Sequence, residues 1–126
     1  MLVEIRASGI CHTDYDTMQW GRTMVMGHEG AGIVLACGEG VTHVQPGDHV
    51  LLNWAMPCGN CFQCRHGAEN ICEEKPEVPN ERFTHNGAHI STSFSLGTMA
   101  TYTVVPWQAV VKMDVEIPFP SAAAAS

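Results

Sequence analysis

The chain has 126 residues, of which 45% are hydrophobic, and a formal net charge of −7. This length fits one domain, or part of a larger protein. No apolar run approaches the roughly 18–20 residues that a membrane span needs, and no basic leader with an apolar core opens the chain. We therefore expect neither a membrane protein nor a secretory signal, and the acidic balance argues against a nucleic-acid surface.

Short strands account for most of the predicted structure, because glycine and proline interrupt the chain at short intervals between β-forming runs. Turns are predicted at Gly38-Glu39-Gly40, as in a hairpin, and at Pro46-Gly47-Asp48. The predicted strands, in chain order, are Leu2–Ala7, Ala31–Cys37, His49–Asn53, Tyr102–Pro106 and Ala109–Lys112.

Helix is expected only in short pieces. Cys11–Gln19 fits one helix, with Thr13 or Asp14 near its start, and a helical turn is expected around Cys61–Gly67. Ser121–Ser126 resembles the first turn of another helix. Because the first strand has no lead-in and the last helix has only begun, we expect a fragment. The sum is a mainly β barrel or sandwich with an inserted lobe.

Four cysteines define that lobe: Cys58-x-x-Cys61-x-x-Cys64, then Cys72 after seven intervening residues. Such spacing favours a tetrahedral four-thiolate zinc site. The first three cysteines also match a bacterial iron–sulfur run, but there the fourth follows after three residues and precedes proline. We therefore favour zinc. Four protein thiolates leave no open position, so this zinc is expected to be structural.

Alternative uses of the six cysteines fit less well. Disulfides are disfavoured because there is no leader and the spacings are typical of metal ligands, which points to reduced thiols in the cytoplasm. A redox-active cysteine pair would need a thioredoxin-like βαβ context, and none is present. After the lobe, the charges are expected to form a solvated loop at Glu73, Glu74, Lys75 and Glu77.

A second group of possible ligands lies upstream, in Cys11-His12-Thr13-Asp14 and Gly27-His28-Glu29-Gly30-Ala31-Gly32. A lone cysteine is usually a buried apolar residue, and a lone histidine is usually not a ligand. Together with the four-cysteine lobe, however, the two motifs resemble the zinc-containing alcohol dehydrogenases of the medium-chain dehydrogenase/reductase family. The resemblance covers essentially the whole chain and extends to Gly38, Val41, the turn at residues 46–50 and Thr101–Val105.

The resemblance implies a GroES-like, partly open β-barrel with short helices. Residues 1–117 would be the catalytic, zinc-binding domain without its first strands, and 118–126 would begin the linker to a nucleotide-binding domain. No G-x-G-x-x-G lies between a predicted strand and helix, so we expect that domain to be absent.

The resemblance also implies a role for each matching position. At the catalytic zinc, Cys11 and His28 would be ligands, and Glu29 an alternate or neighbouring ligand. Asp14 would orient the ring of His28. Thr13 would contact the substrate hydroxyl and begin the proton relay. His12 would lie near the cofactor pyrophosphate. The substrate pocket would be lined by Trp54 and Trp20.

Departures from the family pattern leave some roles open. The family's third zinc ligand is a cysteine beyond Ser126, and Cys37 is interpreted as a packing residue rather than a substitute. Asp16 stands where many members have a relay histidine, so the relay runs through Asp16, through water or by another route. Metal roles are not expected for the remaining histidines, His43, His49, His66, His85 and His89.

Two functions follow. The first is the zinc-binding part of an NAD- or NADP-dependent alcohol dehydrogenase that acts on a primary or secondary alcohol, or an aldehyde. In it, zinc acts as a Lewis acid on the alcohol before hydride transfer. The parent protein is expected to be cytoplasmic and homo-oligomeric, and the isolated chain inactive. The alternative is a non-catalytic structural or binding module with the same fold and one structural zinc.

Overall fold

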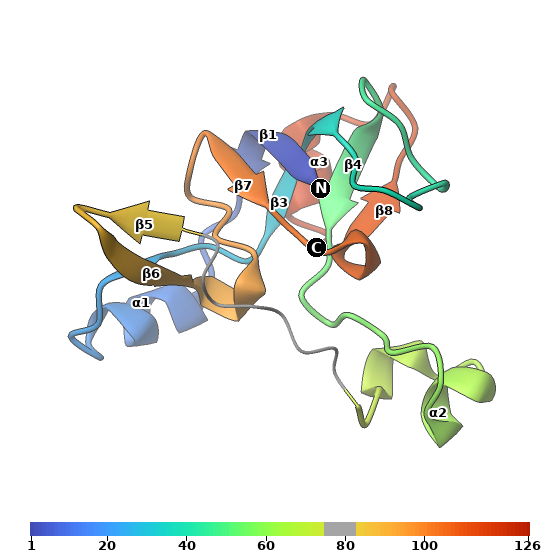
Figure 1. Ribbon diagram of the computed structural model, residues 1–126, viewed down its shortest axis with the longest axis horizontal. Coiled ribbons are helices and arrows are strands. Elements are labelled where there is room, and N and C mark those ends of the chain that lie inside the picture. Colours follow the sequence, from blue (N-terminus) through green and yellow to red (C-terminus); the bar gives the residue numbers. More distant parts are fainter. Residues whose placement is uncertain (75–82) are drawn as a thin grey trace.

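The computed structural model describes residues 1–74 and 83–126, which form two open β-sheets flanked by short helices (Figure 1). The larger sheet has five strands in the order β7-β1-β3-β4-β8, and each neighbouring pair is antiparallel. All five predicted strands are present, with ends shifted by one or two residues. Their bounds are β1 Leu2–Ser8, β3 Gly30–Ala36, β4 His49–Leu52, β7 Tyr102–Val104 and β8 Val110–Lys112.

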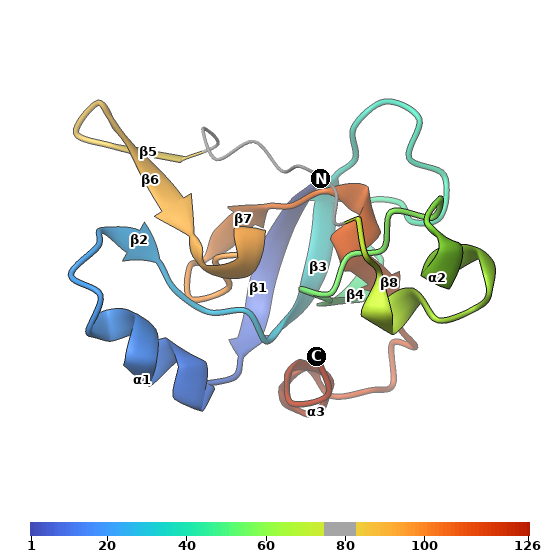
Figure 2. The same ribbon diagram turned by 90° about the horizontal axis from the view of Figure 1, so that it is seen from below.

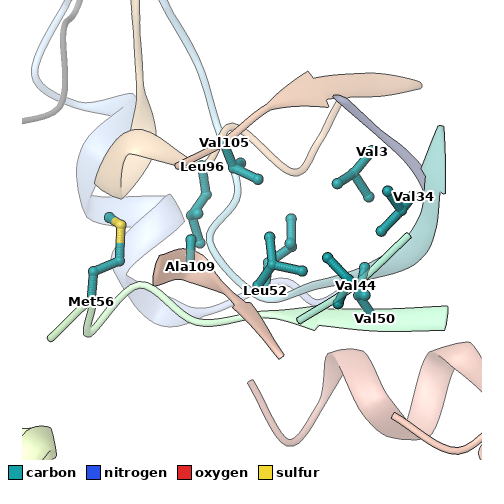
Figure 3. Close-up of a cluster of buried hydrophobic side chains, with 10 residues drawn as sticks. Val3, Val34, Val44, Val50, Leu52, Met56, Leu96, Val105 and Ala109 are labelled. Carbon is teal, nitrogen blue, oxygen red and sulfur yellow. The ribbon is translucent and has the colours of Figure 1, made fainter. Parts of the chain in front are cut away.

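The main hydrophobic core covers one face of this sheet, as alternation along the strands requires. Val3, Val34, Val50 and Leu52 are almost completely buried and point toward one another from β1, β3 and β4 (Figure 3). Leu96 packs against them from the far side of the same core. The mainly β fold is therefore confirmed, although the sheets described stay open and do not close into a barrel.

A smaller three-stranded sheet, in the order β2-β6-β5, lies beside the larger one. It consists of β2 Met24–Val25, β5 Phe83–His85 and β6 Ala88–Thr92. The sequence analysis predicted no strand here. β5 and β6 form an antiparallel hairpin through Asn86 and Gly87, which have φ values of 52° and 79°. Asn-Gly is the preferred dipeptide for a turn with two positive φ angles, so this hairpin could have been predicted.

Two short helices lie outside the sheets, and the second of them packs on the larger sheet. α1 (His12–Met18) follows β1, and its N-cap is Cys11, so Thr13 and Asp14 lie in its first turn, near the start as predicted. α3 (Phe119–Ala123) begins before the predicted Ser121, and Pro120 lies within its first turn, where proline is tolerated. α3 packs across β1, β3 and β4 on the face opposite the main core (Figure 2), where Ala122 and Ala123 are buried.

The cysteine lobe leaves the end of β4 and extends away from both sheets (Figure 1). It contains α2 (Phe62–Arg65) and one turn of 3₁₀ helix at Glu69–Ile71, which pack against each other. The predicted turn around Cys61–Gly67 is confirmed. Beyond the lobe, Glu73 and Glu74 are exposed, as predicted, whereas Lys75 and Glu77 lie outside the described residues.

Within the two described segments of the chain, no helix has the length and apolar character needed to cross a membrane.

Candidate metal centres

The four cysteines of the lobe direct their sulfur atoms toward one point. All four Sγ atoms lie within 4.8 Å of one another. The Cys58–Cys64 separation is 4.0 Å, and the Cys61–Cys72 separation is 3.9 Å. Tetrahedral zinc with Zn–S bonds of about 2.3 Å places its sulfurs about 3.8 Å apart. The cluster therefore fits a closed four-thiolate metal site, as the cysteine spacing predicted.

Local backbone geometry builds this cluster. Gly59 has a φ of 76°, a conformation that glycine adopts without steric cost, and the chain turns sharply there. The turn directs the amides of Asn60 and Cys61 to Cys58 Sγ, at 3.3 and 3.2 Å. The amide of Cys58 donates to Cys72 Sγ at 3.3 Å. Amide hydrogen bonds to sulfur favour the thiolate, the form that binds metal.

Backbone hydrogen bonding and burial move the pKa values of two of these thiols in opposite directions. Hydrogen bonding from the backbone of Cys64 lowers the pKa of Cys61 to about 6. Burial raises the pKa of Cys64 to about 12, and its hydrogen bonds to the other cysteines add to this effect. Neighbouring sulfurs at this spacing cannot all carry negative charge unless a cation compensates. A divalent metal ion would supply that compensation.

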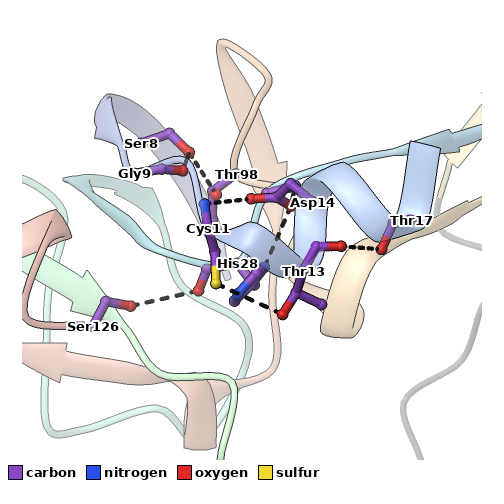
Figure 4. Close-up of polar contacts among 10 residues, drawn as sticks. Ser8, Gly9, Cys11, Thr13, Asp14, Thr17, His28, Thr98 and Ser126 are labelled. Carbon is purple, nitrogen blue, oxygen red and sulfur yellow. Dashed lines mark hydrogen bonds and ion pairs between the residues drawn. The ribbon is translucent and has the colours of Figure 1, made fainter. Parts of the chain in front are cut away.

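The second group forms where two neighbouring strands end (Figure 4). Cys11 follows β1, whereas His28 and Glu29 precede β3, and the antiparallel register pairs Ser8 with Gly30. One possible ligand atom from each of Cys11, His28 and Glu29 lies within 4.8 Å of the other two. His28 is buried, whereas Cys11 and Glu29 are partly exposed. The structure thus brings together three predicted ligands that lie up to 18 positions apart in the sequence.

Asp14 connects the two halves of this group. The residue is 2% exposed, and its Oδ2 accepts a hydrogen bond from the Cys11 amide at 3.0 Å. Its Oδ1 accepts one from the Gly27 amide at 3.3 Å and lies 3.4 Å from His28 Nδ1. That last contact lacks hydrogen-bond geometry, so Nδ1 has no hydrogen-bond partner among the described residues. Asp14 thus faces the predicted nitrogen without a formed hydrogen bond.

Thr13 and His12 lie on different sides of the first turn of α1. Thr13 is half-buried, and its Oγ1 accepts a hydrogen bond from the Cys11 thiol at 3.6 Å, which places the hydroxyl beside the metal group. The His12 side chain is 84% exposed and lies 3.4 Å from Asp16 in an (i, i+4) ion pair. The structure therefore brings Thr13 to the group but leaves His12 and Asp16 at the outer surface.

Aromatic rings flank the metal group. The ring of Phe94 lies 4.6 Å from that of His28 and 5.3 Å from that of Trp54, between centroids. Trp20 and Phe94 line one open apolar hollow of ≈ 210 Å³, together with Met24. Of the two predicted pocket residues, Trp54 contacts Phe94, and Trp20 lines the same hollow as Phe94. Sequence reasoning missed Phe94 because its surroundings read as a polar stretch, and only the tertiary fold brings it to His28.

The residues predicted to have no metal role lie elsewhere. Cys37 packs against the main core, and its thiol donates to the Val44 carbonyl at 3.6 Å. Across residues 1–74 and 83–126, only the two groups above gather three or more possible ligands. The remaining histidines, which lie outside both groups, are His43, His49, His66, His85 and His89.

Comparison with known proteins finds one family model and several relatives that match most of the chain. The family model described as the alcohol dehydrogenase GroES-like domain matches residues 1–115. S-(hydroxymethyl)glutathione dehydrogenase from Synechocystis is 39% identical over 92% of the chain and 35% of its own length. Benzyl alcohol dehydrogenase from Acinetobacter calcoaceticus is 33% identical, with a TM-score of 0.74, over 94% of this chain and 34% of that one.

A further solved structure, from Sinorhizobium meliloti 1021, was determined with NADP bound. It is 27% identical with a TM-score of 0.63 and covers 98% of this chain and 33% of its own. The present chain thus spans about a third of the length of the relatives that it matches.

Proposed function

Because the chain belongs to the alcohol dehydrogenase GroES-like domain family, we propose that it is the zinc-binding catalytic part of an NAD(P)-dependent alcohol dehydrogenase. In this proposal, residues 1–117 form the catalytic domain, and 118–126 lead to a nucleotide-binding domain. The substrate is a primary or secondary alcohol, or the aldehyde in the reverse direction. The observation that carries the proposal is the grouping of Cys11, His28 and Glu29.

The two groups of ligands suit different tasks. Cys58, Cys61, Cys64 and Cys72 would fill all four positions of a zinc ion, so that site serves structure. Cys11, His28 and Glu29 offer one sulfur, one nitrogen and one oxygen donor. Three protein ligands leave a fourth position for substrate, which is the arrangement of catalytic zinc sites. A purely structural module has no use for a second, incomplete set of ligands.

The neighbouring side chains would perform the remaining chemistry. A zinc ion held by the open group would supply a Lewis acid that lowers the pKa of an alcohol hydroxyl. Thr13 Oγ1 can accept the proton of that hydroxyl and donate its own onward, because a threonine hydroxyl is both donor and acceptor. Asp14 would keep the His28 ring oriented toward the metal. Trp54, Trp20 and Phe94 would exclude water from the carbon that loses hydride.

The cofactor and assembly belong to the same proposal. A relative solved with NADP supports a nicotinamide cofactor, and we assign its binding to a separate domain. His12, exposed at the start of α1, is the residue proposed to contact the cofactor pyrophosphate. The arrangement of six unpaired cysteines supports a reducing, cytoplasmic location. We expect the complete enzyme to be a homo-oligomer, as the family resemblance implies.

Hydride transfer can be tested in a chimera. Residues 1–126 would replace the segment that they cover in the Acinetobacter calcoaceticus benzyl alcohol dehydrogenase, and NAD⁺ reduction would be followed with benzyl alcohol and with ethanol. We expect alcohol-dependent NADH formation. His28→Ala should lower kcat/KM at least about 100-fold, because it removes the ligand that holds the Lewis acid.

The matched control is His89→Ala, which removes an exposed histidine outside both ligand groups and should leave turnover unchanged. A folded, zinc-loaded chimera that reduces NAD⁺ equally well with His28→Ala would contradict the proposal.

A further inference from the structure

We propose that Phe94 is a positioning residue for His28, and that the chain retains a strained backbone at residues 94–95 to hold the histidine ring in place. The inference deepens the proposed function, because it concerns the same open metal group. It rests on two independent observations: the missing hydrogen bond at His28 Nδ1 and the backbone conformation of Phe94.

Packing against Phe94 holds the ring of His28 in addition to the nearby Asp14 carboxylate. The residue is 4% exposed, yet its Nδ1 has no hydrogen-bond partner among the described residues, although Asp14 Oδ1 lies 3.4 Å away. A ligand histidine normally has its ring fixed by a hydrogen bond from the second nitrogen. Here the ring of Phe94 lies against it instead, with centroids 4.6 Å apart and planes tilted by 44°. This ring contact restricts the movement of the imidazole.

The backbone of Phe94 adopts a conformation that bulky residues avoid. Its φ and ψ are 47° and 30°, and Ser95 follows with a φ of 61°. Two successive non-glycine residues in the left-handed region are disfavoured, and such strain persists where surrounding contacts over-determine it. The turn is held by amides of Leu96 and Gly97, which donate to the Ser93 carbonyl at 2.9 and 3.3 Å.

The strained turn directs the Phe94 ring to the metal group. β6 ends at Thr92, and the turn that follows places the ring between His28 and Trp54. Trp54 meets Phe94 edge to face, with planes at 61°, an arrangement that aromatic pairs favour. Trp54 thereby packs against the Phe94 ring. A fixed imidazole loses less conformational freedom when it binds a metal, so the ring contact should raise metal affinity.

Cobalt binding tests the inference directly. The purified chain would first receive one equivalent of zinc to fill the four-cysteine site and would then be titrated with Co²⁺. Ligation by Cys11 and His28 would be followed by the sulfur-to-cobalt and visible absorption bands. We expect Phe94→Ala to raise the Co²⁺ dissociation constant about tenfold, as is typical when a residue that orients a metal ligand is removed. The visible absorption bands should also change.

Three further variants separate ring positioning from folding. Phe94→Tyr keeps the ring and should bind Co²⁺ within about twofold of the natural chain, as expected for a contact through the ring face. Phe94→Gly should weaken binding as Phe94→Ala does but melt at a higher temperature than Phe94→Ala, because glycine tolerates a positive φ. Phe62→Ala is the matched control, since the Phe62 ring lies 4.0 Å from His66, a histidine outside both ligand groups. It should leave Co²⁺ binding unchanged.

The inference is overturned if Phe94→Ala, folded by circular dichroism, binds Co²⁺ with unchanged affinity and unchanged bands. A natural chain that gives no cobalt band once the first site holds zinc would instead contradict the metal group of the proposed function, and the inference with it.

Discussion

Gly32 shows how one residue sets the geometry beneath the open metal group. It pairs with Ile5 across β3 and β1, and a Cβ built at this position would lie 2.1 Å from the carbonyl oxygen of Glu4. That oxygen belongs to the backbone and cannot move without displacing β1. Because Cys11 follows β1 and His28 precedes β3, the close approach of the two strands also brings these two possible ligands near each other.

We therefore predict that Gly32→Ala destabilises the zinc-loaded chain by about 3 kcal/mol, because the added methyl group has no space. Urea unfolding followed by circular dichroism measures this loss. The matched control is Gly38→Ala, where a Cβ meets nothing within 4 Å and φ is not positive. It should change stability by no more than about 1 kcal/mol. Equal stabilities for the two variants would show that β1 and β3 can separate freely.

For single residues, the sequence predicted which positions belong to the site better than it predicted the contacts that require them. Gly32 was identified through a family motif, but the contact with Glu4 that requires glycine depends on strand register. Cys11, His28 and Asp14 were correctly expected to lie together. Phe94 was not, because a contact between a turn after β6 and a residue before β3 has no signal in local pattern.

Among the elements, the cysteine lobe is the one whose ordered structure should depend most on a bound metal ion. Its α2 and 3₁₀ turn pack on each other, and the two hydrophobic core clusters contain no residue from Cys58 to Cys72. Zinc binding can contribute roughly 10–16 kcal/mol to the folding of a small module of this kind. The order of the lobe should therefore come from its thiolate–metal bonds.

Removal of zinc with a chelator should release the lobe while the larger sheet persists. Hydrogen exchange measured by mass spectrometry should then show faster exchange at residues 58–72, whose amides at Asn60 and Cys61 bond to Cys58 Sγ. Peptides from β3, inside the main core, serve as the internal control and should stay protected. Unchanged protection in the lobe after complete zinc loss would mean that its own packing suffices.

The hairpin of β5 and β6 marks the limit of prediction for elements. Its Asn86-Gly87 turn is a strong local signal for a hairpin, so this element could be predicted from sequence. The two-residue strand β2 is different, because it exists only through parallel pairing with Ser91 and Thr92. Nothing local in Met24–Val25 indicates that partner. The N-cap of α1 also depends on tertiary context, since Asp14 bonds the amides of both Cys11 and Gly27.

For the whole molecule, the sequence predicted a mainly β chain with two separate groups of metal ligands, and the structure has the β-sheets and brings each set of possible ligands together. The cysteine spacing was sufficient to predict the four-cysteine group, since its four possible ligands lie within one short segment. The open group needed the antiparallel pairing of β1 with β3, which a family motif conveys but which residue spacing alone does not. The exposed position of His12 and Asp16 likewise follows from the orientation of α1.

The central claim is that one chain holds two zinc ions, one for structure and one for chemistry. Native mass spectrometry of the zinc-saturated chain tests it most directly. We predict two zinc ions per chain, one in Cys64→Ser and one in His28→Ala, each variant losing a different ion. A natural chain that binds a single zinc, retained in full by His28→Ala, would contradict the account.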